Sequence, residues 1–228
     1  MKVKIINNAK EATGIAVIID VFRAFTVEPY LINNGAKKLI PVGDKQMAYD
    51  YKQKDNNCIL IGERKGVMLP GFDYGNSPAQ IQNIDFTGKT VIHTTSCGTQ
   101  GIANAVNAQE IITGSFVNAK AIVKYIMSRN IEEVSLVVLC RPEEEPFEED
   151  ELCAKYLKSL LEKQPLDDLE IEIQKLKTTS GAKFFNDSLQ EVFPEKDFYL
   201  CTEIDKFDFI LKVNKSDDGV SYIEKIEI

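Results

Sequence analysis

Short, apolar, β-branched runs alternate with segments of helical periodicity up to about Pro165 of this 228-residue chain. The runs are continuously apolar, which is typical of strands buried on both faces of a parallel sheet. The amphipathic segments between them can form the crossover helices that such a sheet requires. The pattern therefore predicts a three-layer α/β/α fold with a largely parallel sheet. The predicted strands are Val3–Ile6, Ile15–Ile19, Lys38–Val42, Cys58–Ile61, Thr90–His93, Glu110–Thr113 and Val134–Leu139, and the predicted helices include Met47–Lys54, Gly101–Ala108, Ala119–Ser128 and Asp150–Lys163.

The tail from Leu169 onward has a different pattern and predicts a strand-rich C-terminal part. Asp217-Asp218-Gly219 is typical of the turn of a β-hairpin. No linker-like composition precedes the tail, so we expect one α/β unit over residues 1–228, with a second lobe from about residue 165 left open. The strand-like runs are Glu170–Lys177, Phe198–Cys201, Phe207–Val213 and Val220–Ile228.

Composition and net charge restrict the classes of partner and the cellular compartment that we expect for this chain. The net charge of −8 disfavours nucleic acid and anionic membranes as partners. No uncharged apolar run approaches membrane-spanning length, and residues 1–10 lack a signal-peptide core, so we expect a cytoplasmic protein. The five cysteines, an odd number without paired spacing, fit thiols in a reducing compartment. The sequence leaves a homo-oligomer open.

Residues 62–78 gather glycines, prolines, two carboxylates and an arginine directly after a predicted strand. They read Gly-Glu-Arg-Lys-Gly-Val-Met-Leu-Pro-Gly-Phe-Asp-Tyr-Gly-Asn-Ser-Pro. Glycines let backbone amides approach a ligand, and prolines fix the path of a loop. Loops at the carboxyl ends of parallel strands are where α/β proteins bind ligands. We therefore expect a binding loop here, with a purely structural loop as the alternative.

Carboxylates follow two other predicted strands. Asp20 ends one strand, and seven acids occupy positions 143–151 after another. Most of these acids complement a helix dipole, but Glu149 and Asp150 can reach the sheet edge that carries Asp20 and Glu63. Oxygen ligands from several loops suit Mg²⁺, which retains water and binds phosphates.

The residues that follow Asp20 bear on its role. Thr26 is a plausible N-cap of the next helix, because Pro29 then falls in the first turn, where proline is tolerated. This leaves Asp20 available for a ligand, with Arg23 beside it at the same edge. The alternative is that Asp20 itself caps the helix.

The loop Thr94–Thr99 reads Thr-Thr-Ser-Cys-Gly-Thr and precedes a predicted helix. Four hydroxyls and the amides of a helix start provide the donors of an anion site. An N-cap is the alternative, although a cap needs only one hydroxyl.

Two catalytic patterns of known phosphatases are absent from this chain. Cys58 and Arg64 have Cys-x5-Arg spacing, but the residues between them are strand-like, so Cys58 should be buried and protonated. Asp20 is followed two residues later by Phe22 rather than by a second aspartate. His93, the only histidine, is expected to pack in the core or at a strand edge. None of the cysteines is expected to act as a nucleophile, although Cys97 lies at a predicted helix start, which would lower its pKa.

The segments described above resemble the 2-phosphosulfolactate phosphatase family of coenzyme M biosynthesis. They occur in the family's order and at similar spacing over about residues 15–157, and the glycine-rich segment is the most specific of them. The resemblance implies an α/β phosphatase that uses Mg²⁺ to hydrolyse a phosphate ester of a small sulfonated hydroxy acid. The resembling stretches are Ile19-Asp20-Val21-Phe22-Arg23-Ala24, Gly62-Glu63-Arg64, Gly71-Phe72-Asp73-Tyr74-Gly75-Asn76-Ser77-Pro78, Thr94-Thr95-Ser96-Cys97-Gly98-Thr99 and Glu149-Asp150-Glu151-Leu152-Cys153-Ala154.

The resemblance also implies roles for individual residues. Asp73 would position or deprotonate the attacking water, and Asp20 and Arg23 are the other catalytic candidates. The expected Mg²⁺ ligands are Asp20, Glu63, Glu149 and Asp150. The expected substrate-binding residues are Arg64, Asn76, Ser77, Thr94, Thr95, Ser96, Gly98 and Thr99.

The chain departs from the family's pattern at three places. Lys65 stands where members often have a second glycine, and Gln100 stands where an arginine often follows the threonine loop. Residues 141–146 read Arg-Pro-Glu-Glu-Glu-Pro in place of a glycine-containing stretch. These changes leave two alternatives open. One is a non-catalytic protein that binds small anions, and the other is a metal-dependent hydrolase of another phosphorylated metabolite.

Overall fold

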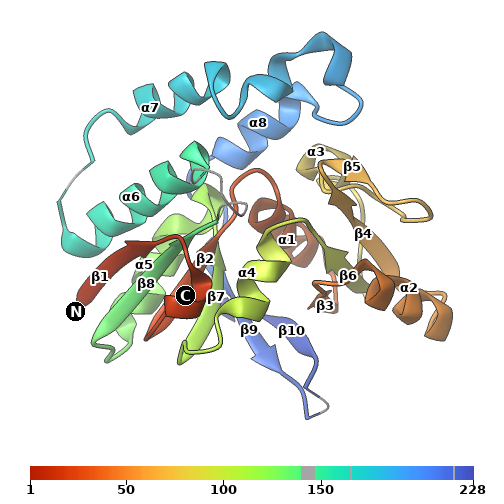
Figure 1. The fold of residues 1–228 in the computed structure, drawn as a ribbon, viewed down its shortest axis with the longest axis horizontal. Helices are drawn as coiled ribbons and strands as arrows, with labels where there is room; N and C mark the ends of the chain where they lie inside the picture. Colours follow the sequence, from red (N-terminus) through yellow and green to blue (C-terminus); the bar gives the residue numbers. More distant parts are fainter. Residues whose placement is uncertain (140–146, 165, 218) are drawn as a thin grey trace.

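The protein, described by a computed structural model, is built on a ten-stranded sheet flanked by helices (Figure 1). The structure describes residues 1–139, 147–164, 166–217 and 219–228. The departure at 141–146 therefore lies outside the described residues. This architecture confirms the predicted three-layer α/β fold with a mostly parallel sheet.

Two groups of parallel strands make up most of the sheet. The first group is, in spatial order, β1 (Lys2–Ile6), β8 (Glu133–Val138), β2 (Ile15–Ile19) and β7 (Glu110–Gly114). The second group is β3 (Lys38–Pro41), β6 (Thr90–Thr94) and β4 (Ile59–Arg64). The strand β5 (Val67–Met68) pairs antiparallel with β4 at the edge.

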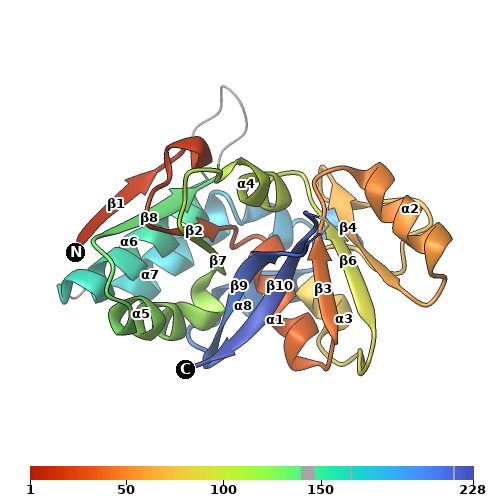
Figure 2. The same ribbon diagram turned by 90° about the horizontal axis from the view of Figure 1, so that it is seen from below.

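A C-terminal hairpin joins the two groups. Its strands, β9 (Phe209–Lys215) and β10 (Ser221–Glu227), lie between β7 and β3 and pair antiparallel with both (Figure 2). The predicted hairpin at the end of the chain is thus confirmed, and it completes the sheet from within.

Helices cover both faces of the sheet because its central strands are apolar on both sides. In β2, Val17 packs in one core cluster with Ile122, while its neighbour Ile18 packs in another with Phe25 on the opposite face. A third cluster buries Ala48 against the second parallel group. The helices are α1 (Ala24–Asn33), α2 (Lys45–Lys54), α3 (Pro78–Ile81), α4 (Gly98–Asn104), α5 (Ala119–Ser128), α6 (Glu148–Glu162), α7 (Leu169–Lys175) and α8 (Glu195–Thr202). Within the described ranges, none of these helices has the length and apolar character needed to span a membrane.

Two of the four strands predicted in the tail are wrong, because these segments are helices. Ile173 and Leu176 are buried while Ile171 is 55% exposed, so the apolar residues obey the i, i+3 spacing of a helix. Phe198 and Cys201 repeat that spacing in α8, where both are fully buried. The tail from α7 to α8 crosses one end of the sheet (Figure 1).

The predicted starts of two helices also need correction. Helix α1 begins at Ala24, so Thr26 lies inside it and donates its hydroxyl to the Val21 carbonyl at 3.0 Å. The N-cap residue is Arg23, and Asp20 Oδ1 accepts from the Ala24 amide, the first of the helix, at 3.1 Å. Helix α4 begins at Gly98 rather than at Gly101.

Candidate active site

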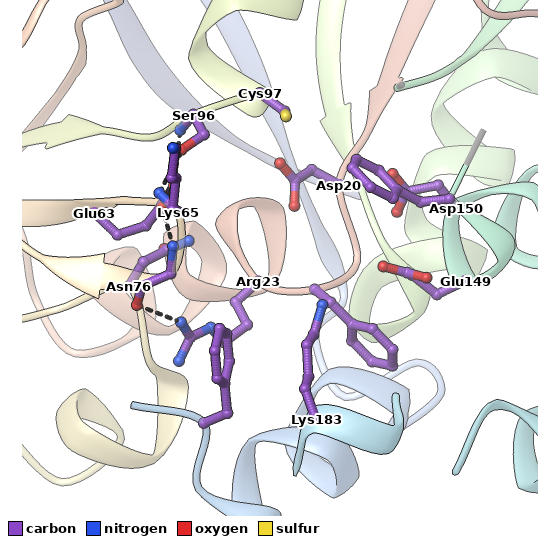
Figure 3. A pocket seen from close by; sticks show the side chains of 14 residues that line it. Asp20, Arg23, Glu63, Lys65, Asn76, Ser96, Cys97, Glu149, Asp150 and Lys183 are labelled. Atoms are coloured by element: carbon purple, nitrogen blue, oxygen red, sulfur yellow. Dashed lines mark hydrogen bonds between the residues drawn. The ribbon is translucent and has the colours of Figure 1, made fainter. Parts of the chain in front are cut away.

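A cavity of about 140 Å³ opens at the carboxyl ends of β2, β4 and β6. Helix α6 and the tail complete its walls, so segments from the whole length of the chain meet there (Figure 3). Its described lining residues are Asp20, Phe22, Arg23, Glu63, Lys65, Gly66, Asn76, Ser96, Cys97, Phe147, Glu149, Asp150, Lys183 and Phe193.

Three buried carboxylates form one side of this cavity. Asp20, Glu149 and Asp150 are 9%, 3% and 1% exposed. Asp150 Oδ1 accepts from the Val21 amide at 2.7 Å, which ties the first turn of α6 to the end of β2. The structure therefore confirms that Glu149 and Asp150 reach the sheet edge that carries Asp20.

Mutual repulsion and burial make these carboxylates unusual acids. Burial, together with the charges of Glu63 and Glu149, raises the pKa of Asp20 to about 7. Burial likewise raises the pKa of Glu149 and raises that of Asp150 well above its ordinary value. Glu149 Oε2 has no hydrogen-bond partner among the described residues. A cation among these groups would offset both the repulsion and the missing contact.

The residues fit a hydrated cation better than a bare one. In the parts of the chain that the structure describes, no three His, Cys, Asp or Glu side chains are already arranged to hold a metal ion. Mg²⁺ needs only one or two carboxylates when it retains waters and contacts a phosphate. Oxygen atoms of Asp20, Asp150 and Glu149 are the donors available for such an ion.

Glu63 lines the cavity but uses both carboxylate oxygens to hold two loops together. Its Oε1 accepts from the Ser96 amide at 2.7 Å, and its Oε2 accepts from the Gly66 amide at 2.6 Å and the Ser96 hydroxyl at 3.0 Å. Lys65 and Gly66 form the two-residue turn between β4 and β5, with φ of +54° and +83°. The segment predicted as a loop after Ile61 is thus a hairpin for its first residues.

Arg23 is the buried cation of the cavity. One of its terminal nitrogens donates to the Val192 carbonyl and to Asp197 Oδ2, both at 2.9 Å, and the other donates to the Gly66 carbonyl at 3.2 Å. Its guanidinium also lies 4.8 Å from the ring centroid of Phe193. Three of the five N–H donors of the guanidinium are engaged, which leaves two for a ligand.

The predicted substrate residues divide into two sets. Asn76 and Ser96 line the cavity. Ser77 instead donates to Asp197 Oδ1 at 2.8 Å, and Thr95 and Thr99 hydrogen-bond each other inside their loop. Thr94 accepts from Arg64, at 2.9 Å, and does not line the cavity.

Gly98 brings the threonine loop close to Asp20. A Cβ at this position would lie 2.8 Å from Asp20 Oδ2 and 3.0 Å from the Cβ of Ala24. A side chain there would therefore displace the carboxylate, so Gly98 contributes by its small size rather than by a contact to substrate.

Asp73 is the one predicted catalytic residue that the structure does not bring to the cavity. Its Oδ2 accepts from the Leu60 amide at 2.8 Å and pairs with Lys52 at 3.2 Å. It is absent from the described lining of the cavity.

Lys183 and Phe193 were missed by the sequence analysis. Lys183 lies in the 3-10 helix Ala182–Phe185 and faces Glu149 across the cavity (Figure 3). Its positive charge opposes the rise in the pKa of Glu149 and Asp150 caused chiefly by burial. No local motif marks it, because more than thirty residues of irregular and helical chain separate it from the acids that it faces.

A second, larger cavity of about 920 Å³ adjoins the first through Lys65, Ser96 and Cys97. Arg64 and Lys65 supply positive charge, and its described lining contains no carboxylate. The remaining lining residues are Asn7, Asn8, Ala9, Gly43, Thr95, Ser96, Cys97, Gln100, Gly101, Asn104 and Leu139.

The buried cysteines show no sign of nucleophilic activation. Burial raises the pKa of Cys58, and raises those of Cys153 and Cys201 well above the ordinary value of a thiol. None of the three lines the cavity. Cys97 does line it, at the start of α4.

Comparisons with known proteins identify the family to which the sequence is similar. A sequence profile described as 2-phosphosulpholactate phosphatase matches residues 3–216. The probable 2-phosphosulfolactate phosphatase of Bacillus subtilis (strain 168) is 32% identical over 94% of this chain and 92% of its own length. Its counterpart in Caldicellulosiruptor saccharolyticus is 40% identical over 75% of this chain and 76% of its own, and that of Thermoplasma volcanium is 31% identical over 91% and 94%.

Proposed function

Because this chain belongs to the 2-phosphosulpholactate phosphatase family, we propose that it hydrolyses the phosphate monoester of a small anionic hydroxy acid, 2-phosphosulfolactate or a close analogue. One observation carries the proposal: the buried carboxylates of Asp20, Glu149 and Asp150 line the same cavity as the Arg23 guanidinium. Carboxylates can hold a metal ion or accept a proton, while the guanidinium can hold the phosphoryl group.

Mg²⁺ is the cofactor that this donor set favours. Asp20 and Asp150 would hold it, each with one oxygen engaged by a backbone amide and the other available. The ion would supply positive charge opposite the phosphoryl oxygens. Glu63, whose oxygens hold the Ser96 loop and the β4–β5 turn, would act by positioning these loops.

The phosphoryl group would be held from the opposite side of the cavity. Two N–H groups of Arg23 remain for its oxygens, and Asn76 and Ser96 can add neutral donors. Lys183 would offset charge that develops as the ester bond breaks.

In the reaction, a water oxygen attacks phosphorus, the phosphorus–oxygen ester bond breaks, and the alcohol leaves with a proton. Glu149 is our candidate to accept the proton of the water, because burial raises its pKa and its Oε2 has no described partner. The same proton can pass to the departing oxygen, which balances the step. Asp73, which does not line the cavity, is reassigned to a structural role.

The second cavity provides for the second charge of such a substrate. Arg64 and Lys65 line it, and none of its described lining residues is acidic. The sulfonate or carboxylate group of the substrate could therefore lie there while the phosphoryl group enters the first cavity. Gln100 donates its side-chain amide to the Gly43 carbonyl at 3.0 Å and carries no charge. We infer that discrimination for the sulfonate is relaxed relative to a site with an additional arginine.

A second candidate function is anion binding without turnover. The observation in its favour is that both oxygens of Glu63 are engaged by protein donors, which removes one expected metal ligand. Asp20→Asn separates the two functions, because a binder keeps its affinity for inorganic phosphate while a phosphatase loses turnover.

Phosphate release from 2-phosphosulfolactate, phospholactate, phosphoglycolate and p-nitrophenyl phosphate tests the proposal. Each ester is assayed with Mg²⁺ and again with EDTA. We expect release from at least one phosphorylated acid that stops when the metal is removed. Failure of the folded protein to release phosphate from all four, at any Mg²⁺ concentration, would exclude the proposed activity on this class of ester.

A further inference from the structure

A chain of buried polar side chains lies directly behind Asn76. His93 is fully buried, with Nε2 3.1 Å from Asn76 Oδ1 and Nδ1 3.1 Å from Glu28 Oε1. The Thr113 hydroxyl donates to Glu28 Oε2 at 3.3 Å. Glu28 is also fully buried, so no solvent reaches either member of the ionisable pair. Glu28, His93 and Thr113 come from α1, β6 and β7, whereas Asn76 precedes α3. Of the four, only Asn76 lines the cavity.

The orientation of the Asn76 amide identifies the donor nitrogen of His93. Oδ1 of Asn76 can only accept a hydrogen bond and lies 3.1 Å from Nε2, so Nε2 is the donor of this contact. The other ring nitrogen, Nδ1, faces Glu28 Oε1 at 3.1 Å, and the side-chain partners of Glu28 among the described residues are His93 and Thr113. Glu28 therefore holds the ring with Nε2 toward Asn76.

A proton on Nε2 holds the Asn76 amide in this orientation. Nε2 can donate only to an acceptor, so Oδ1 of Asn76 faces it and Nδ2 points the other way. Nδ2 has no hydrogen-bond partner among the described residues, although Asn76 as a whole is only 5% exposed. The free N–H donors thus belong to the side of the amide that borders the cavity.

We propose that His93 is a positioning residue that presents the Asn76 N–H donors, and not its carbonyl oxygen, to the phosphoryl group. The reversed amide would place an acceptor against an anion, which is repulsive. The proposal rests on the proposed function for the identity of the anion. It goes beyond packing, because a histidine that only filled the core would not need a defined proton on the nitrogen nearest the site.

The proton on Nε2 can be observed without any assay of activity. His93 is the only histidine, so a ¹⁵N-labelled protein gives a single imidazole spin system. We expect a protonated Nε2 whose hydrogen exchanges slowly with water. A bare, pyridine-type Nε2 in the folded protein would overturn the proposal, whether or not the protein proves to be a phosphatase.

Affinity for inorganic phosphate in the presence of Mg²⁺, measured by calorimetry, tests the route through Asn76. Glu28→Gln/His93→Leu removes the Nε2 donor without leaving a buried charge, and we expect about tenfold weaker binding or more, the value of one hydrogen bond to a charged group. The triple variant, which adds Asn76→Ala to these two substitutions, should bind phosphate no more weakly than Asn76→Ala alone. Losses that multiply would show that His93 does not act through Asn76.

Thr113→Val is the matched control, because it removes a partner of Glu28 but leaves the contact between His93 and Asn76. We expect it to retain phosphate affinity. Thermal melts establish that each variant is folded. If the double variant does not fold, the proton on Nε2 in the unmodified protein still decides the matter.

Discussion

At the scale of single residues, Asp20 combines a structural and a chemical role. From the sequence, bonding to the start of α1 and ligand binding are alternatives for Asp20, but the carboxylate has two oxygens and can do both. Oδ1 accepts from the Ala24 amide, and Oδ2 lies beside Gly98 in the cavity. Sequence position placed Asp20 and Glu149 at the right edge of the sheet. It could not show that Glu63 uses both carboxylate oxygens on neighbouring loops, or that Thr99 bonds Thr95 within its own loop, because such contacts depend on how the loops fold.

Asp20→Asn should lower kcat/KM by about a hundredfold or more, since losing even a supporting contact of a metal site costs 10- to 100-fold. The amide keeps the oxygen that accepts from Ala24 while removing the charge. The variant should remain folded, and phosphate release together with a thermal melt checks both points. Activity within about threefold of the unmodified protein would exclude Asp20 as a metal ligand.

The raised pKa of Asp20 predicts how stability without metal depends on pH. The folded protein holds a proton on Asp20 up to about pH 7, whereas the unfolded chain releases it near its ordinary value of 3.8. The folded state therefore binds more protons between these values, so stability without Mg²⁺ should fall as pH rises from about 4 to 7. Melting temperatures in EDTA measure this slope. Asp20→Asn should flatten it, and a slope of the opposite sign would contradict the buried carboxylate cluster.

Asp73→Asn should leave kcat/KM within about threefold and cost about 1 kcal/mol of stability. The carboxylate accepts from the Leu60 amide, and its ion pair with Lys52 is about a third exposed, so screening limits its value. Steady-state kinetics and denaturant unfolding provide the two readouts. A loss of two orders of magnitude in turnover, without unfolding, would restore a catalytic role to Asp73.

At the scale of elements, the strands predicted from continuous apolar runs and the crossover helices predicted from amphipathic segments are both present. The prediction failed in the tail because the same apolar residues fit both the two-residue period of a strand and the period of a helix. Ile171 and Ile173 alternate with acids as in a strand, yet burial of Ile173 with Leu176 follows the helical period. This error matters for the site, because the tail supplies Lys183 to the cavity and binds Arg23 through Val192 and Asp197.

Asp197→Asn tests the link between α8 and the cavity. Asp197 is fully buried, and its carboxylate pairs with Arg23 while accepting from Ser77 and the Ala79 amide. Removing one charge of a buried pair costs about 3–5 kcal/mol. We expect that loss in denaturant unfolding, accompanied by lower kcat/KM from a displaced Arg23.

Glu151→Gln is the matched control, because it breaks a solvent-exposed ion pair with Lys155 and should change stability little. Equal effects of the two substitutions would show that the Arg23–Asp197 pair does not hold the site.

At the scale of the whole molecule, two parallel groups of strands meet through the C-terminal hairpin. The order of the strands could not be predicted, because no local pattern specifies that a hairpin at the end of the chain enters the middle of the sheet. This topology leaves two adjoining cavities at one edge, one bordered by buried carboxylates and one by Arg64 and Lys65.

The two cavities predict selectivity for small doubly anionic esters with little preference for the sulfonate. A neutral donor in place of an arginine against a buried anion loses about 1–3 kcal/mol, roughly five- to hundredfold in affinity. We expect kcat/KM for 2-phosphosulfolactate to exceed that for phospholactate or phosphoglycolate by less than about a hundredfold. A larger preference would show that Lys65 and Arg64 recognise the sulfonate specifically.

The most direct test of the central claim follows the ³¹P NMR signal of 2-phosphosulfolactate incubated with the protein. With Mg²⁺ present, the ester signal should be replaced by that of inorganic phosphate. Conversion should stop on addition of EDTA, resume with excess Mg²⁺ and be absent with Asp20→Asn. An unchanged ester signal, or conversion at the same rate in EDTA, would contradict metal-dependent hydrolysis at the three buried carboxylates.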